Sequence, residues 1–143
     1  MVIGELLSNK LEYVWIRPFD PRPVHKNDPE PDTGSYDCYL QFSNDQLYLV
    51  KPCEQQVYYD RYPSLVLDIV GVSFDQLNEV KMRSTIFNAI AQYLPSTVIS
   101  IQLADPLGED TLTGITLYIE RDMSLHIQHI LPPMTLGVSA RPV

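Results

Sequence analysis

The segment SLVLDIVGV at residues 64–72 is predominantly apolar and is typical of a mostly buried strand. Ser73 follows as an N-cap residue, and Gln76 completes a capping box, so a helix is predicted to begin directly after Ser73. Pro95 ends that helix, because proline has no N–H to donate and disfavours helical geometry at the preceding residue. Residues 97–103 then form a second apolar strand. This stretch predicts a strand–helix–strand unit with one long helix.

Two β-hairpins are predicted to flank this unit. The first spans residues 36–52 and turns at Asn44-Asp45, since both residue types tolerate positive φ. The second spans residues 112–130 and needs an odd-numbered loop to bring its apolar residues onto one face. The predicted fold class is therefore α+β, with a mixed, largely antiparallel sheet and one long helix packed on it.

The 143 residues are predicted to form a single domain over residues 1–143. Five of the 12 prolines fall between residues 17 and 35, which favours an extended, polyproline-like arm lying on its own domain or on a neighbouring subunit. The remaining segments are a short helix with an extended entry (1–16), the α+β core (36–130) and a non-periodic, extended tail (131–143).

The acidic balance of the chain limits its partners. Eighteen acidic residues against 10 basic ones give a formal net charge of -8, which disfavours general binding to nucleic acid. No apolar run approaches the roughly 20 residues that a membrane span needs. The N-terminus also lacks the basic start and long apolar stretch of a signal peptide. We therefore expect a soluble protein that is synthesised in the cytoplasm and binds no membrane.

No residue pattern in the sequence predicts catalysis. Ser73 lies in a Gly71-Val-Ser-Phe-Asp75 turn that resembles a nucleophile motif, but Asp75 stands where that motif needs its second glycine. Ser73 is better explained as a helix cap, and Cys38 is predicted to be a buried, unreactive thiol. The sequence therefore predicts a protein that is not an enzyme.

The sequence also predicts no metal site and no cofactor. His126 and His129 are three residues apart, and on a strand such positions face opposite ways, so they cannot share an ion. Two cysteines, Cys38 and Cys53, are too few for a disulfide scaffold or a four-thiolate zinc site, and free thiols are expected.

Tyrosines supply the candidate interface. Tyrosine combines a large contact area with a polar tip and is enriched at protein interfaces. Tyr39 and Tyr48 are predicted to share the face of the first hairpin that points away from the core, and Tyr58, Tyr59 and Tyr62 follow closely. The alternative is that these rings only support the helix or the arm.

A candidate ligand site lies on the second hairpin. Strand alternation places four polar side chains on one side, where they can converge on a small polar ligand. These residues are Thr116, Tyr118, His126 and Gln128.

Two functional hypotheses follow. The first is a non-enzymatic structural or assembly protein that forms homo-oligomers, and contacts other proteins, through the arm and the tail; a virion component such as a phage tail or connector protein is one form of it. The alternative is a small intracellular ligand-binding or regulatory domain that uses the polar face of the second hairpin.

Overall fold

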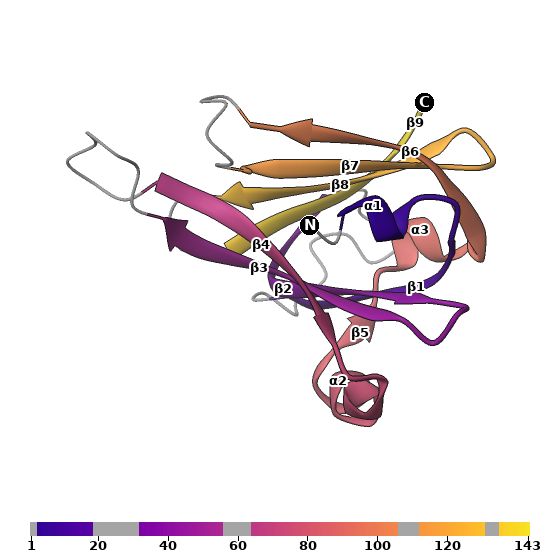
Figure 1. Cartoon of the computed structure of the whole chain (residues 1–143), viewed down its shortest axis with the longest axis horizontal. Helices are drawn as coiled ribbons and strands as arrows, with labels where there is room; N and C mark the ends of the chain where they lie inside the picture. Colours follow the sequence, from indigo (N-terminus) through magenta and orange to yellow (C-terminus); the bar gives the residue numbers. More distant parts are fainter. Residues whose placement is uncertain (1–2, 19–31, 56–63, 106–111, 131–134) are drawn as a thin grey trace.

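Six antiparallel strands close into a barrel (Figure 1). The computed structural model describes residues 3–18, 32–55, 64–105, 112–130 and 135–143. Around the ring, each strand pairs with the next and the last pairs with the first; in order they are β1 (Lys10–Pro18), β2 (Asp32–Phe42), β9 (Thr135–Pro142), β8 (Met123–Ile130), β7 (Gly114–Ile119) and β6 (Ser96–Ala104).

Strand β2 pairs with two different strands along one of its edges. Its first half pairs with β9, and its second half pairs with β3 (Leu47–Gln55), which in turn pairs with β4 (Ser64–Val72). The β3–β4 pair therefore extends the sheet outside the closed ring. Every strand pairing in the described ranges is antiparallel, so the predicted mixed sheet is replaced by an antiparallel one.

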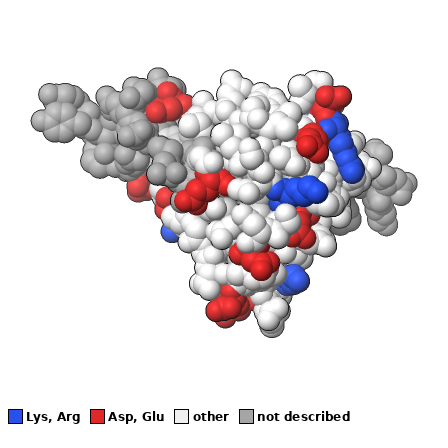
Figure 2. Space-filling model, turned by 45° about the vertical axis from the view of Figure 1, so that its right-hand side comes forward, with Lys and Arg blue, Asp and Glu red and all other residues white. Residues whose placement is uncertain are grey.

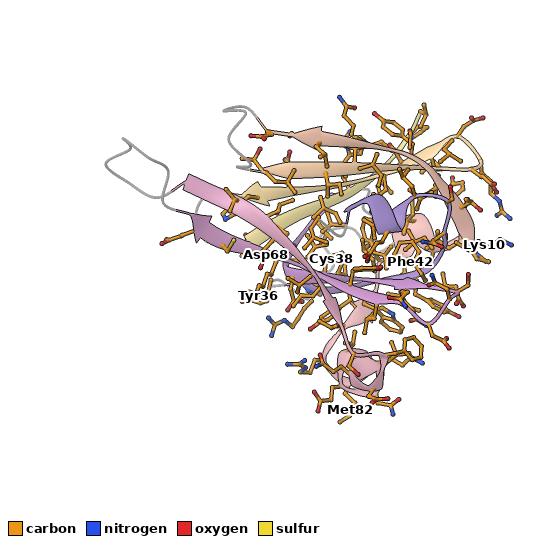
Figure 3. All side chains as sticks on the ribbon, viewed as in Figure 1. Lys10, Tyr36, Cys38, Phe42, Asp68 and Met82 are labelled. Carbon is orange, nitrogen blue, oxygen red and sulfur yellow. The ribbon has the colours of Figure 1, made fainter. Side chains whose placement is uncertain are left out.

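The barrel interior is filled by apolar side chains from alternate strand positions. Leu117, Leu125 and Val138 are buried there, and Figure 3 shows Cys38 and Phe42 pointing between the two layers. Each fully buried side chain of this size contributes about 1.5–3 kcal/mol. The barrel is therefore a packed core.

Two short helices close one end of the barrel. In Figure 1, α1 (Ile3–Leu6) and α3 (Asn88–Ala91) both lie between the layers. Leu6 and Ile90, one from each helix, are both 0% exposed and belong to the main core. Among the described residues, no helix has the length and apolarity to cross a bilayer.

The predicted α+β fold with one long helix is wrong. The expected helix over residues 74–94 divides into η1 (Phe74–Gln76), α2 (Leu77–Arg83), the two-residue strand β5 (Thr85–Ile86) and α3. The helix ends where Ser84 adopts an extended conformation (φ -123°, ψ 165°). The β-branched pair in β5 then bonds to β1 opposite Trp15 and Ile16. Pairing with a strand distant in sequence therefore overrides the helical period.

The predicted N-cap at Ser73 forms, but it organises only the turns that directly follow it. The Ser73 hydroxyl accepts from the backbone N–H of Asp75 at 3.3 Å and caps the short helical turn that leads into α2. Leu77 and Val80 of α2 then pack on Trp15 and Tyr39, outside the barrel. Ser73 caps a helical turn as predicted, but its partner is Asp75 and Gln76 makes no side-chain cap hydrogen bond, so the predicted capping box is not formed; α2 is only two turns long.

Within the predicted extended tail, residues 135–142 form the strand β9. This strand pairs with β8 on one side and with β2 on the other, so it completes the ring. Leu136, Val138 and Ala140 point into the core, while Gly137 and Ser139 alternate with them. Several residues of this strand are small or only weakly apolar, so the alternation of inward and outward positions is hard to recognise in the sequence.

The predicted odd-numbered loop in the second hairpin is confirmed. Ile119 pairs with Met123, which leaves Glu120, Arg121 and Asp122 in a three-residue loop. Arg121 and Asp122 both have positive φ (72° and 57°), as the sharp reversal requires.

Helix α1 is tied to the sheet by a hydrogen bond. The Tyr48 hydroxyl donates to Glu5 Oε2 at 3.0 Å. Burial, together with the hydrogen bond to Glu5 and its charge, raises the pKa of Tyr48 from 10.0 to about 12. The folded state therefore holds this proton more tightly than the unfolded chain does.

We expect Tyr48→Phe to reduce the fall in the free energy of unfolding as the pH rises into the alkaline range. A raised folded pKa contributes stability that is complete below pH 10 and is lost as the pH rises through about 12. Urea unfolding between pH 9 and pH 12 should show the wild type losing stability more steeply than Tyr48→Phe. Parallel losses in the two proteins would contradict the tie to Glu5.

Candidate ligand-binding site

A polar row crosses the outer face of four neighbouring strands. Strand register places Gln102 of β6 opposite Thr116 of β7, Thr116 opposite His126 of β8, and His126 opposite Ser139 of β9. The residues on either side of this row in each strand point into the core or toward it, because strand side chains alternate. The barrel thus presents hydrogen-bonding groups from four strands at one level.

His126 is held at both ring nitrogens. Its Nδ1 lies 3.0 Å from Thr116 Oγ1, and its Nε2 lies 2.9 Å from Ser124 Oγ. Ser124 Oγ also donates to the backbone carbonyl oxygen of Arg141 at 3.0 Å. Since Ser124 has only one hydroxyl proton, it must accept from His126 Nε2–H. In the neutral ring, Nδ1 then accepts from the Thr116 hydroxyl.

This proton arrangement makes Ser124 a poor nucleophile. Its hydroxyl proton is committed to a carbonyl, so His126 is not placed to remove it as a general base would. The side chain is also only 2% exposed. The hydrogen bond from His126 to Ser124 therefore fixes the orientation of the imidazole ring.

A hollow of about 180 Å³ opens beside this polar row. Its floor is at Gly114, where an added Cβ would lie 3.5 Å from the Cβ atoms of Ala104 and Gln128. Thr116 and His126 line it as a cross-strand pair, and Gln128 lies directly opposite Gly114. The absence of a side chain at Gly114 leaves the room in which a ligand can meet these groups.

Gln102 is oriented at the rim of the hollow by a neighbour. The Tyr118 hydroxyl donates to Gln102 Oε1 at 2.8 Å, so the carboxamide oxygen is engaged. Its NH₂ group remains as the donor of this side chain. Among the described residues that line the hollow there is no Asp, Glu, Lys or Arg. The site therefore offers neutral donors and acceptors.

The sequence placed four residues on this face, and the register confirms that Thr116, Tyr118, His126 and Gln128 point the same way. Thr116, His126 and Gln128 line the hollow, whereas Tyr118 acts through Gln102. Gln102 itself was missed, since nothing in the sequence shows that β6 pairs with β7.

The candidate interface tyrosines lie elsewhere. Tyr39 and Tyr48 are both buried, in different apolar clusters. They were expected to share a face, but Tyr39 pairs with Leu49 and Leu40 pairs with Tyr48, one step away from the expected register. The reason is a three-residue loop in which Asp45 has positive φ (61°). Tyr58, Tyr59 and Tyr62 fall outside the described residues.

The described part of the chain holds no cluster of three or more potential metal ligands. His126 and His129 face opposite sides of β8, as predicted, because His129 falls in register with the inward-facing positions of that strand. Both cysteines are free. Burial raises the pKa of the Cys38 thiol far above its usual range, and burial followed by the Asp68 charge raises the pKa of Cys53. Neither thiol is set up as a thiolate at neutral pH.

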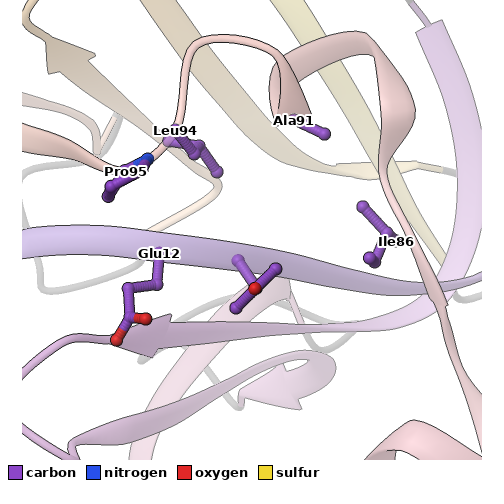
Figure 4. A pocket seen from close by; sticks show the side chains of 6 residues that line it. Glu12, Ile86, Ala91, Leu94 and Pro95 are labelled. Carbon is purple, nitrogen blue, oxygen red and sulfur yellow. The ribbon is translucent and has the colours of Figure 1, made fainter.

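A second hollow, of about 110 Å³, lies between β1 and α3 (Figure 4). Its lining is mainly apolar, with Ile86, Ala91 and Leu94, and in Figure 4 the Glu12 carboxylate points away from Leu94. It offers fewer hydrogen-bonding groups than the hollow over Gly114, so it is the weaker candidate.

Charged groups on the described surface form isolated pairs. Arg17 Nη2 lies 3.0 Å from Asp37 Oδ2, and the Arg17 guanidinium lies 5.2 Å from the centre of the Tyr36 ring. Burial raises the pKa of Asp37, although the charges of Arg17 and Arg83 oppose that shift. Figure 2 shows acidic and basic residues interspersed on one face, without a large patch of either sign.

Comparison of the chain with protein-family models, with curated proteins and with solved structures gives no match.

Proposed function

We propose that this chain is a binding module that holds a small, uncharged, hydrogen-bonding ligand in the hollow over Gly114. The observation that carries the proposal is the hydrogen-bonded chain of Thr116, His126 and Ser124 beside a hollow whose described lining carries no Asp, Glu, Lys or Arg. Concave sites with a few fixed polar groups are typical of small-molecule binding.

The lining selects for neutral ligands that carry both donors and acceptors. With His126 neutral, the Thr116 oxygen keeps lone pairs for a ligand donor, and the Gln102 and Gln128 amides supply further donors. The described lining offers an anion no Lys or Arg, and a chain of net charge -8 repels it. Sugar hydroxyls and amides are the chemical groups that fit best.

The site is organised before a ligand arrives. His126 is fixed at both nitrogens, and Ser124 is fixed by the backbone of β9. Groups that are already ordered lose little conformational entropy when a ligand binds, which favours affinity in a shallow site. Because the Ser124 hydroxyl donates its proton in a hydrogen bond to the Arg141 carbonyl oxygen, we assign the site to binding and give it no catalytic role.

The assembly hypothesis loses part of its basis. Residues 135–142 form a strand of the protein's own barrel, and Tyr39 and Tyr48 are buried. The arm between residues 19 and 31 lies outside the described residues. Assembly through the arm and the tail therefore remains a prediction from the sequence, and the polar hollow supports the binding role better.

Thermal unfolding with neutral and anionic probes tests the binding role. We expect galactose or N-acetylglucosamine, at roughly ten times its Kd, to raise the Tm of the wild type by about 2–6 °C, and inorganic phosphate to have no such effect. Thr116→Val should abolish the shift, because it removes the hydroxyl beside His126.

Thr97→Val is the matched control. It makes the same change on β6, opposite Lys10 and away from the hollow, and should keep the full shift. Neutral probes that leave the wild-type Tm unchanged, or that stabilise both valine variants equally, would contradict the proposal.

A further inference from the structure

Strand β6 has a free edge beyond Val98. On one side it pairs with β7 as far as Ala104. On the other side β1 reaches only Ser96 and Thr97, followed by the bond from Val98 N–H to the Asn9 carbonyl oxygen. Within the described residues, no strand pairs with 99–104 on that side. Figure 1 shows β6 as the outermost strand of the upper layer.

The side chains along this edge are exposed and uncharged. Ile99 is 60% exposed and Leu103 is 43% exposed. Leu103 pairs with the buried Ile115 and so lies on the inner side of the sheet, yet no neighbouring strand covers it. The whole strand, STVISIQLA, contains no charged residue and no proline. Natural edge strands usually carry such residues because they block pairing with another chain.

We propose that two copies of this chain pair edge to edge, antiparallel, through residues 99–104. In a two-fold pairing the same segment meets itself, so a charged edge would repel its own copy. This edge is free of charge although the chain as a whole carries -8, so self-pairing meets no such repulsion. The partner best suited to the edge is therefore a second copy.

One register matches the exposed residues. With Ile101 on the two-fold axis, Leu103 lies opposite Ile99 of the partner subunit, and Gln102 lies opposite Ser100 of the partner subunit. Ile99 lies where the register of β6 with β7 shifts, and this pairing brings the two exposed apolar residues of the edge to opposing positions. The four-stranded layer of β9, β8, β7 and β6 would continue into the same layer of the second copy. The paired segment shares Gln102, Leu103 and Ala104 with the lining of the hollow, so the pairing is tested without added ligand.

Sedimentation velocity on the full chain tests the pairing. We expect the mass to approach twice 16.3 kDa as the concentration rises, and Leu103→Lys to remain monomeric at the same concentrations. Met82→Lys is the control: it adds the same charge at an 86% exposed residue on α2 (Figure 3) and should still dimerise. A wild type that stays monomeric up to about 1 mM would overturn the proposal, as would dimerisation of Leu103→Lys at wild-type strength.

Hydrogen exchange on the wild type gives a second test that needs no variant. Amides in residues 100–104 should exchange more slowly at dimer-forming concentrations than in dilute solution. Amides of β7, which has strand neighbours on both sides, should not change. Dimers or larger assemblies that form without protection at 100–104 would show that another surface joins the copies and would overturn the proposal.

Discussion

Replacing Val138 by asparagine is expected to lower the free energy of unfolding by about 3–6 kcal/mol. Val138 is buried in β9, between Ile127 of β8 and Thr33 of β2. The substitution removes a buried apolar side chain, worth about 1.5–3 kcal/mol, and leaves an amide without partners in the core, which costs about 1–3 kcal/mol more. Urea unfolding followed by circular dichroism measures the loss.

Ser139→Asn is the matched control, because it places the same side chain at the next position, on the outer face of β9. Ser139 lies opposite His126, where an amide can reach water. Its expected cost is below about 1 kcal/mol. If the two asparagine variants were equally stable, residues 135–142 would not form a barrel strand.

Leu6→Ala is expected to cost about 2–5 kcal/mol, the range for a leucine removed from a packed core. Leu6 is 0% exposed and lies in α1, which closes one end of the barrel beside Ile90 of α3. Chemical unfolding measures the loss. A cost of this size would show that the first residues of the chain belong to the core.

The adjacent residue supplies the comparison. Leu7 is 41% exposed, so Leu7→Ala removes the same atoms from the surface and should change stability by less than about 1 kcal/mol. Equal effects at the two positions would contradict the capping role of α1.

Local patterns in the sequence identified the strands of the second hairpin and the parity of its loop correctly, whereas the loop of the first hairpin was predicted one residue too short. Strand alternation placed Thr116 and His126 on one face, and the parity of the second hairpin required its three-residue loop. Both depend on residues that are close in the sequence, where the turn fixes the register. The apolar run of β4 and the Ser73 cap are local signals of the same kind.

The closed barrel was not predictable in this way, because closure depends on distant pairings. β1 pairs with β6 and β9 inserts between β8 and β2, and β1–β6 and β9–β2 join segments far apart in the sequence, where no local pattern records the pairing. The same cause broke the predicted long helix, since Thr85 and Ile86 find partners in β1 about 70 residues earlier. Period 3.6 and period 2 compete in that segment, and the tertiary contact decides between them.

The candidate site shows the same division. Three of its lining residues came from one hairpin and were visible in the sequence, whereas Gln102 and the hollow itself required the pairing of β6 with β7. The sequence did not identify Gly114 as part of the site, because the effect of a missing side chain depends on the residues beside it in the neighbouring strands. The polar side chains of the site were thus predictable from the sequence, whereas the hollow beside them was not.

The most direct test of the binding role is a ¹H–¹⁵N titration of the labelled protein with galactose and N-acetylglucosamine. We predict that the resonances that move most will be the backbone amide of Gly114 and the side-chain amides of Gln102 and Gln128, while His129, on the opposite face of β8, stays unchanged. Shifts confined to another part of the barrel, or no shifts with either sugar at concentrations on the order of 10 mM, would contradict a binding site over Gly114.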